Sequence, residues 1–171
     1  MHVFQPYPIE SLEFNVFTRL KDDWGVITAE SEGKVNAMTA SWGTVGYLWN
    51  KNVVVIYVRR SRYTHEFLEN SDFFSLSFFD MSNKENRMAL KILGSVSGRN
   101  EDKIAGVRFN VNHKKNIPFI DEANFVFLCH KLAKIPMDDP SYFLDKSIMK
   151  NYEDGDYHDI YIGEVMEVMA R

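Results

Sequence analysis

The run Val53–Val58 (VVVIYV) is the sequence feature that most restricts how this chain can fold. β-Branched and aromatic side chains fit an extended, pleated backbone, so the run predicts a strand. No polar residue interrupts it, which indicates a strand that is buried on both faces. The fold must therefore cover this strand from two sides.

Short stretches of strand-forming residues recur along the whole chain. The predicted strands are 12–20, 24–29, 35–40, 43–48, 53–58, 73–79, 123–132 and 157–169. Gly33 lies in a turn that predicts a hairpin, 50–52 predicts a second turn, and Gly163 predicts a bulge. In 73–79, odd-numbered and even-numbered side chains should face opposite sides of a sheet.

Only two clear helices are predicted. Ser61 is a candidate N-cap for a short helix with Tyr63, Phe67 and Leu68 near one side. The second predicted helix is 83–93, ended by Gly94, with an apolar face formed by Met88, Ala89, Ile92 and Leu93. The remaining predictions are an extended arm at 1–10, a single turn at 101–105, a polar surface loop at 110–117 and a long excursion at 136–155. Many short strands with few helices predict a mainly β fold, a β-barrel in one domain over 1–171.

Several classes of protein and ligand site are disfavoured. The chain lacks the glycine-rich motifs of dinucleotide-binding and P-loop folds. Its net charge is −4 and it has no long basic run, which argues against nucleic acid. We find no signal-peptide pattern and no apolar run long enough for a membrane span. Cys129 is the single cysteine, so an internal disulfide is impossible. These features predict a cytoplasmic protein.

Three segments carry groups suited to a flat, anionic ligand. The first is KVNAMTASWG (34–43), in which Thr39 and Ser41 should point the same way and Gly43 allows close approach. Taken alone, this segment is better explained as an ordinary strand end with Trp42 in the core.

The second segment is RRSRYT (59–64), which places three arginines at the start of a predicted helix. Free backbone N–H groups and the helix dipole attract anions there, and arginine binds phosphate through two hydrogen bonds. A solvated basic turn explains the segment about equally well.

The third segment is GSVSGRNEDK (94–103). Ser95, Ser97 and Gly98 can form a loop that presents amides, while Arg99 and Lys103 supply positive charge. The alternative is a polar loop between two helices.

The histidines and the cysteine give weaker signals. No paired spacing of zinc ligands occurs among His2, His65, His113, His130 and His158, so no metal site is predicted. Cys129 is predicted to be a small buried side chain, facing away from its neighbour His130. His158 lies near the start of the last predicted strand, where a hydrogen-bonded or surface histidine is the default. A catalytic role near a substrate is the minority interpretation, of interest because histidine titrates near neutrality.

Taken together, the ordered segments resemble the flavin reductase-like family, also called the flavoredoxin-type FMN-binding split barrel. The resemblance is carried by Asn36–Gly43, Arg59-x-Ser61-Arg62-Tyr63-Thr64, Phe74–Phe79, Gly94-x-x-Ser97-Gly98-Arg99-x-x-Asp102-Lys103, Glu122-Ala123, Cys129 and Asp156-Tyr157-His158-x-x-Tyr161-Ile162-Gly163-Glu164. It covers most of 24–133 and 156–165, in the family's order. The arm at 1–10 and the excursion at 136–155 match the family least.

The resemblance implies a homodimer of Greek-key split barrels with FMN near the subunit interface. Residues 39–42 would contact the flavin ring, residues of 59–64 would hold its phosphate, and residues of 97–103 would close over it. The candidate cofactor-binding residues are Met38, Thr39, Ala40, Ser41, Trp42, Arg59, Ser61, Arg62, Tyr63, Thr64, Ser97, Gly98, Arg99 and Lys103.

The function implied by the resemblance is an FMN-dependent oxidoreductase that passes electrons from NADH or NADPH through FMN to flavin or another acceptor. The alternative is a flavoredoxin-like electron carrier with tightly bound FMN, a redox protein partner and no nicotinamide site. A binding module for another ligand, such as haem, is a third interpretation from a different class. An absorption spectrum of the purified protein separates it from the first two.

Overall fold

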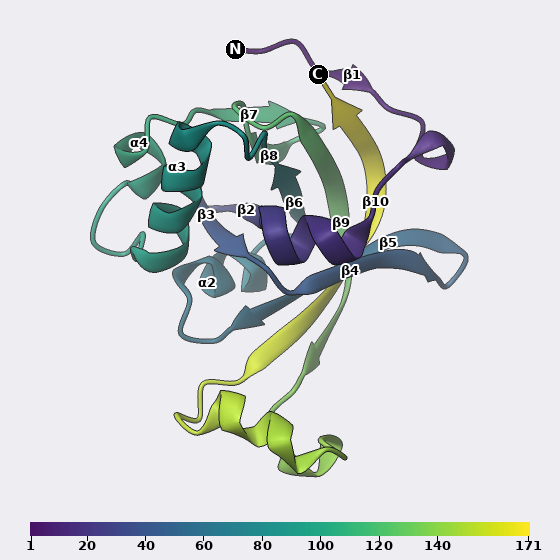
Figure 1. Cartoon of the computed structure of the whole chain (residues 1–171), viewed down its shortest axis with the longest axis vertical. Coiled ribbons are helices and arrows are strands. Elements are labelled where there is room, and N and C mark those ends of the chain that lie inside the picture. Colours follow the sequence, from purple (N-terminus) through teal and green to yellow (C-terminus); the bar gives the residue numbers. More distant parts are fainter.

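The structure is a computed structural model that describes residues 1–171. Its main sheet is entirely antiparallel and runs in the order β3-β2-β6-β9-β10-β5-β4, with β1 added to β10 (Figure 1). The strands are β1 (Gln5–Pro6), β2 (Gly25–Ser31), β3 (Lys34–Ala40), β4 (Gly43–Leu48), β5 (Lys51–Arg59), β6 (Phe73–Phe78), β9 (Phe125–Pro136) and β10 (His158–Ala170). A mainly β fold is therefore confirmed.

The remaining elements are short. They are α1 (Val16–Thr18), α2 (Tyr63–Glu69), α3 (Lys84–Ser95), α4 (Lys103–Gly106), a hairpin of β7 (Val111–Lys114) and β8 (Ile117–Ile120), three 3₁₀ turns (Ile9–Ser11, Pro140–Tyr142, Lys146–Tyr152) and a π-helical turn (Arg19–Asp23). None of the helices combines the length and the apolar character needed to cross a membrane.

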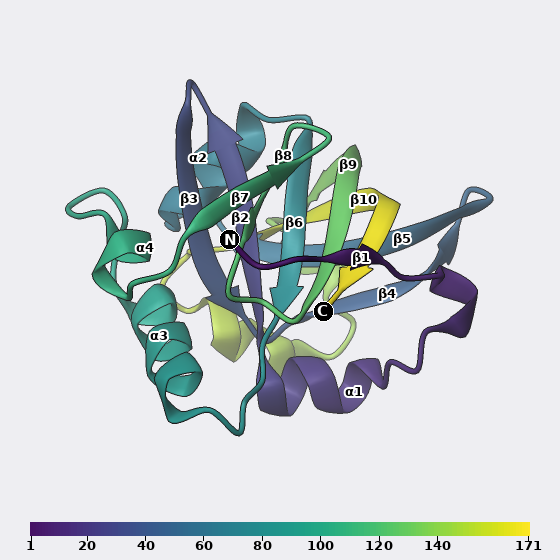
Figure 2. The ribbon, with the colours of Figure 1, turned by 90° about the horizontal axis from the view of Figure 1, so that it is seen from above.

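Two hydrophobic cores lie on opposite faces of the curled sheet. The alternation predicted for 73–79 creates this division, because Phe74 and Phe78 enter the first core while Phe79 enters the second. Ser75 also faces the second side, where its hydroxyl donates to the Pro118 carbonyl at 2.6 Å. α3, α4 and the β7–β8 hairpin cover that side of the sheet (Figure 2).

The strand β5 is less deeply buried than its sequence predicts. Val54, Ile56 and Val58 lie in the first core, but Val55 and Tyr57 on the other face are only half-buried. On that other face only Val53 is fully buried, so the side of β5 away from the first core is incompletely covered.

The predicted bulge at Gly163 is confirmed. The pairing of β10 with β9 shifts register between Ile162 and Gly163. A Cβ atom at Gly163 would lie 2.6 Å from the Phe74 ring and 3.0 Å from Cys129 Cβ. The sheet faces can approach this closely only because residue 163 has no side chain.

Two predictions of secondary structure are wrong. Residues 12–20 do not form a strand: the Asn15 side chain accepts from the Phe17 N–H and starts a helical segment, with Val16 and Leu20 packed on the first core. Residues 110–117 are not a plain loop, because β7 turns through Lys115 and Asn116, both at positive φ, into β8. All four residues of β8 are buried, which explains why a polar, basic sequence is held in a hairpin.

Smaller corrections concern the ends of elements. Arg62, and not Ser61, precedes α2 as its N-cap residue, and it makes no side-chain capping bond. Trp49 and Asn50 form the turn predicted at 50–52. The helix α3 includes Gly94, and its buried residues are Ala89, Leu90 and Leu93, while Met88 is 53% exposed.

The excursion at 136–155 extends away from the barrel as two 3₁₀ turns (Figure 1). Its inner side is anchored by stacked aromatic rings, with Tyr152 between Phe143 and Tyr157. The excursion therefore lies beside the start of β10, where His158 is located.

Candidate functional site

The fold brings the three polar segments together at one end of the barrel. A basic cavity of 80 Å³ is lined by Ser61, Arg62, Tyr63, Thr64, Ser95, Val96, Ser97, Gly98 and Lys103. A strand-end cavity of 220 Å³ is lined by Met38, Thr39, Ala40, Ser41, Trp42, Tyr57, Arg59, Arg62 and His158. Arg62 lines both cavities, so the two adjoin at this residue and together make up the candidate site.

Two contacts between distant segments build this arrangement. The Asn36 side chain on β3 donates to the Thr64 hydroxyl on α2 at 2.8 Å. Gly98 packs against the same asparagine, since a Cβ there would lie 2.2 Å from Asn36 Oδ1. Asn36 thus contacts both the start of α2 and the segment 95–103, and brings these two parts of the site together.

Arg62 is the cation that the protein leaves available in the site. Its guanidinium is half-buried and takes part in no hydrogen bond or ion pair. Burial lowers the pKa of Arg62, with the nearby Asp156 acting in the opposite direction. A partly buried charge without a partner is costly, so this position favours an anion in the cavity.

Lys103 contributes a second positive charge to the basic cavity. It is buried and donates to the carbonyls of Leu93 and Val96 at the end of α3. Burial, and then the charge of Arg62, lower the pKa of Lys103 to about 8. An anion bound between the two cations would stabilise the charged lysine.

The start of α2 adds neutral donors. The N–H groups of Tyr63 and Thr64 face no acceptor within the protein. The Thr64 hydroxyl accepts from Asn36, which leaves its own proton free to donate. These donors line the same basic cavity as Arg62.

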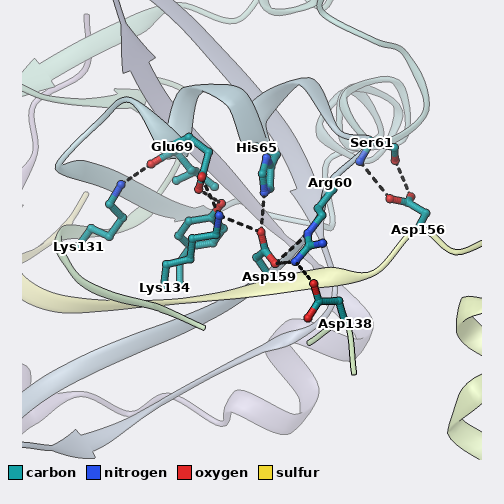
Figure 3. Close-up of polar contacts among 11 residues, drawn as sticks. Arg60, Ser61, His65, Glu69, Lys131, Lys134, Asp138, Asp156 and Asp159 are labelled. Carbon is teal, nitrogen blue, oxygen red and sulfur yellow. Dashed lines mark hydrogen bonds and ion pairs between the residues drawn. The ribbon is translucent and has the colours of Figure 1, made fainter. Parts of the chain in front are cut away.

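Three other candidate phosphate ligands are already engaged. Arg59 donates to the carbonyls of Asn151 and Asp156, which ties it to the excursion. Ser61 donates from its backbone N–H (3.0 Å) and its hydroxyl (2.5 Å) to the Asp156 carboxylate (Figure 3). Arg99 bonds the Ser61 carbonyl and the Glu66 carboxylate. The structure places all three near the site, but not as free ligands.

Successive side chains at the strand end 38–42 point to opposite faces of the sheet. Met38 and Ala40 are buried in the first core. Thr39 points toward α3 and donates to the Leu90 carbonyl at 2.6 Å. Trp42 is not a core residue: it is 49% exposed and its ring lies 5.1 Å from that of His158.

His158 is buried and faces the strand-end cavity. It pairs with Arg59 across β10 and β5, and its Nδ1 lies 2.9 Å from the Tyr152 hydroxyl. Burial, and then the charge of Arg59, lower the pKa of His158 to about 4. The ring is therefore neutral at pH 7, a property that its position in the sequence did not indicate.

Cys129 and His130 face opposite sides of the sheet, as predicted for adjacent residues of a strand. Cys129 is fully buried in the first core, and burial raises the pKa of its thiol. His130 lies on the other face, beside the Phe73 ring. The two side chains do not form a dyad.

A polar network behind α2 was not visible in the sequence. One ligand atom from each of His65, Glu69 and Asp159 lies within 4.8 Å of the others, a grouping that histidine spacing did not reveal. Asp159 accepts from Arg60 and His65, and Lys134 bridges it to Glu69 (Figure 3). Burial alone would raise the pKa of Asp159, but hydrogen bonds from Arg60 and His65 outweigh it and lower that pKa to about 2. Because cations already balance the carboxylates of Glu69 and Asp159, we assign these residues a structural role and not a metal-binding one.

The sequence matches the Flavin reductase like domain over residues 17–171. The chain belongs to the flavin reductase-like family. No curated protein matches the sequence significantly.

Solved structures resemble this flavin reductase-like chain in fold. Flavoredoxin from Methanosarcina acetivorans is 19% identical with a TM-score of 0.67, covering 87% of this chain and 68% of that protein. An FMN-binding domain of a flavin reductases-like enzyme from Shewanella baltica is 17% identical with a TM-score of 0.69, covering 99% and 79%. The styrene monooxygenase flavin reductase from Pseudomonas putida is 16% identical with a TM-score of 0.62, covering 86% and 79%. The predicted split-barrel fold is thereby confirmed.

Proposed function

We propose that this flavin reductase-like chain binds FMN across the two adjoining cavities. The observation that supports the proposal most is Arg62, a half-buried cation without an acidic partner at the point where the cavities meet. The phosphate belongs in the basic cavity, because Arg62, Lys103 and the free N–H groups at the start of α2 surround it. The flavin ring belongs in the strand-end cavity, which contains the flat side chains of Trp42, Tyr57 and His158.

The proposed activity is an oxidoreductase that passes electrons from NADH or NADPH to free flavin or another acceptor. Bound FMN supplies the redox chemistry, while the protein binds and orients it. His158 is neutral and, if Tyr152 donates to its Nδ1, presents its Nε2–H as a hydrogen-bond donor. We propose that it orients a polar group in the strand-end cavity and does not act as a cation.

The proposal is tested by the absorption spectrum of the purified protein, followed by anaerobic addition of NADH, NADPH or dithionite. We expect a flavin spectrum that is bleached by dithionite and by at least one nicotinamide donor. Absence of FMN binding at micromolar concentration would contradict the cofactor assignment. Binding of FMN without oxidation of either donor would contradict the reductase activity alone.

The second candidate function is a flavoredoxin-like electron carrier, favoured by the similarity in fold to flavoredoxin. In this case FMN binds tightly and electrons are exchanged with a redox protein. Negligible turnover of NADH and NADPH, restored by adding a ferredoxin or a reductase, distinguishes it from the reductase.

We also propose a homodimer. The edge strand β4 and the turn that follows expose Tyr47 (70%), Leu48 (37%) and Trp49 (56%), and large apolar groups beside an unpaired strand edge favour association. Light scattering coupled to size exclusion measures the mass directly. A monomer of 19.9 kDa at micromolar concentration would contradict the proposal.

The lowered pKa of Lys103 predicts that FMN affinity depends on pH. Phosphate binding favours the charged lysine, and the free protein loses that charge as pH rises through about 8. Between pH 7 and 9 we expect the Kd for FMN to rise by up to about tenfold, because Lys103 loses its charge over this range while the phosphate is already mostly ionised at pH 7. Calorimetric titration measures this.

The matched variant is Lys103→Gln, which keeps a side-chain N–H donor near the Leu93 and Val96 carbonyls but removes the charge. It should bind FMN more weakly at pH 7 and with little dependence on pH. An affinity of the unmodified protein that stays constant from pH 7 to 9 would contradict the placement of Lys103 beside the phosphate.

A further inference from the structure

A third cavity adjoins the candidate flavin site, and the proposed placement of FMN in the first two cavities does not use it. This Trp24 groove has a volume of 410 Å³ and is lined by Trp24, Thr39, Ser41, Leu90, Lys91, Gly94 and Ser95. It lies between the end of β3 and the second half of α3. Its size is within the range of small-molecule sites in proteins.

The groove adjoins the other two cavities and shares lining residues with each. Thr39 and Ser41 line both the groove and the strand-end cavity, and Ser95 lines both the groove and the basic cavity. Gly94 lets α3 pack closely on Thr39, because a Cβ at this position would lie 3.3 Å from Thr39 Cβ. The groove and the strand-end cavity therefore lie on either side of Thr39 and Ser41, close enough for one extended ligand to occupy both.

Trp24 gives the groove an aromatic wall in a fixed position. It packs against the second core and is half-buried. Its backbone has φ 60° and ψ 160°, a region that residues other than glycine rarely occupy. Packing against the second core holds the tryptophan in this strained conformation, with its side chain at the groove.

The groove also offers a free cation and a free hydroxyl. Lys91 is exposed and forms no ion pair with any acidic residue of the chain. The Ser41 hydroxyl is exposed and makes no hydrogen bond to the protein. An aromatic face, an ammonium group and a hydroxyl together suit a nucleoside attached to a phosphate.

We propose that the Trp24 groove binds the adenosine half of a nicotinamide dinucleotide, with the base against Trp24 and the pyrophosphate near Lys91. The nicotinamide half then reaches across Thr39 and Ser41 into the strand-end cavity. This inference rests on the proposed reductase function and names the site that selects its donor.

The test compares NADH with reduced nicotinamide mononucleotide, which lacks the adenosine half. In the FMN-loaded protein, Trp24→Ala should raise the KM for NADH about tenfold, the effect expected for loss of one base–aromatic stack. Lys91→Ala should raise the same KM about threefold, as for loss of an exposed charge contact. Neither variant should change the KM for the mononucleotide or the Kd for FMN.

Two further variants keep the result interpretable. Trp24→Gly removes the ring but suits the backbone at φ 60°, so it should fold even if Trp24→Ala does not, and it should show the same selective loss. Lys84→Ala, an exposed lysine at the start of α3, should leave all constants unchanged.

Each outcome decides between the alternatives. Equal KM values for NADH and the mononucleotide in the unmodified protein, or an unselective effect at Trp24, overturn the inference. A weaker Kd for FMN in the Trp24 variants also overturns it, because the groove would then belong to the flavin. FMN binding with oxidation of neither donor overturns the proposed reductase itself, a result that the FMN titration separates from the others.

Discussion

Arg62→Ala should raise the Kd for FMN about 100-fold, which corresponds to about 2.7 kcal/mol. The substitution removes a half-buried guanidinium that has no partner inside the protein and lines both cavities of the proposed site. Hydrogen bonds from arginine to phosphate are charge-assisted and form in pairs, so their loss is costly. Quenching of FMN fluorescence on titration, at fixed salt concentration, measures the change.

The comparison variant is Arg99→Ala, in the same cluster of cations. Arg99 donates to the Ser61 carbonyl and the Glu66 carboxylate and lies over the Tyr63 ring, so its charge is already balanced. We expect a rise in the Kd of only about threefold, typical of an exposed charge. An effect at Arg99 as large as that at Arg62 would show that the loop rearranges on binding and that our ranking is wrong.

Gly163→Ala should lower the free energy of unfolding by about 3 kcal/mol and the Tm by about 10 °C. The new methyl carbon would lie 2.6 Å from two atoms of the Phe74 ring and 3.0 Å from Cys129 Cβ. Both neighbours are fully buried in the first core, so neither can move into solvent. The strand must therefore shift at the bulge, or the ring must leave its rotamer. Thermal and urea unfolding followed by circular dichroism measure the loss.

Gly46→Ala is the matched control, since the same atom is added to a strand of the same sheet. Gly46 lies in the exposed edge strand β4, and a Cβ there meets no atom within 4 Å. The substitution should be neutral or slightly stabilising, because alanine loses less conformational freedom on folding. Equal effects at the two glycines would mean that backbone freedom, and not the contact with Phe74, explains the cost at Gly163.

The strands were predictable because their signals are local. The alternation at 73–79 and the β-branched run at 53–58 fix backbone preference within a few residues. The prediction failed at 12–20 and 110–117, where a side-chain cap or burial against the core outweighed the local preference. An asparagine cap and the core contacts of Val16 and Leu20 turn the first into a helix. Burial of β8 holds residues 110–117 in a hairpin with it.

The sequence by itself determined the family resemblance, the mainly β fold and the three polar segments that meet at the site. Only the tertiary structure decided which cations in those segments remain available. Arg59 and Arg60 are paired with residues 90 or more positions away, and Arg62 is left free. A sequence lists charges, but ion pairing depends on which distant strands and turns come within a few ångströms. For the same reason only the structure could reveal the Trp24 groove, whose walls come from β3, α3 and the residue before β2.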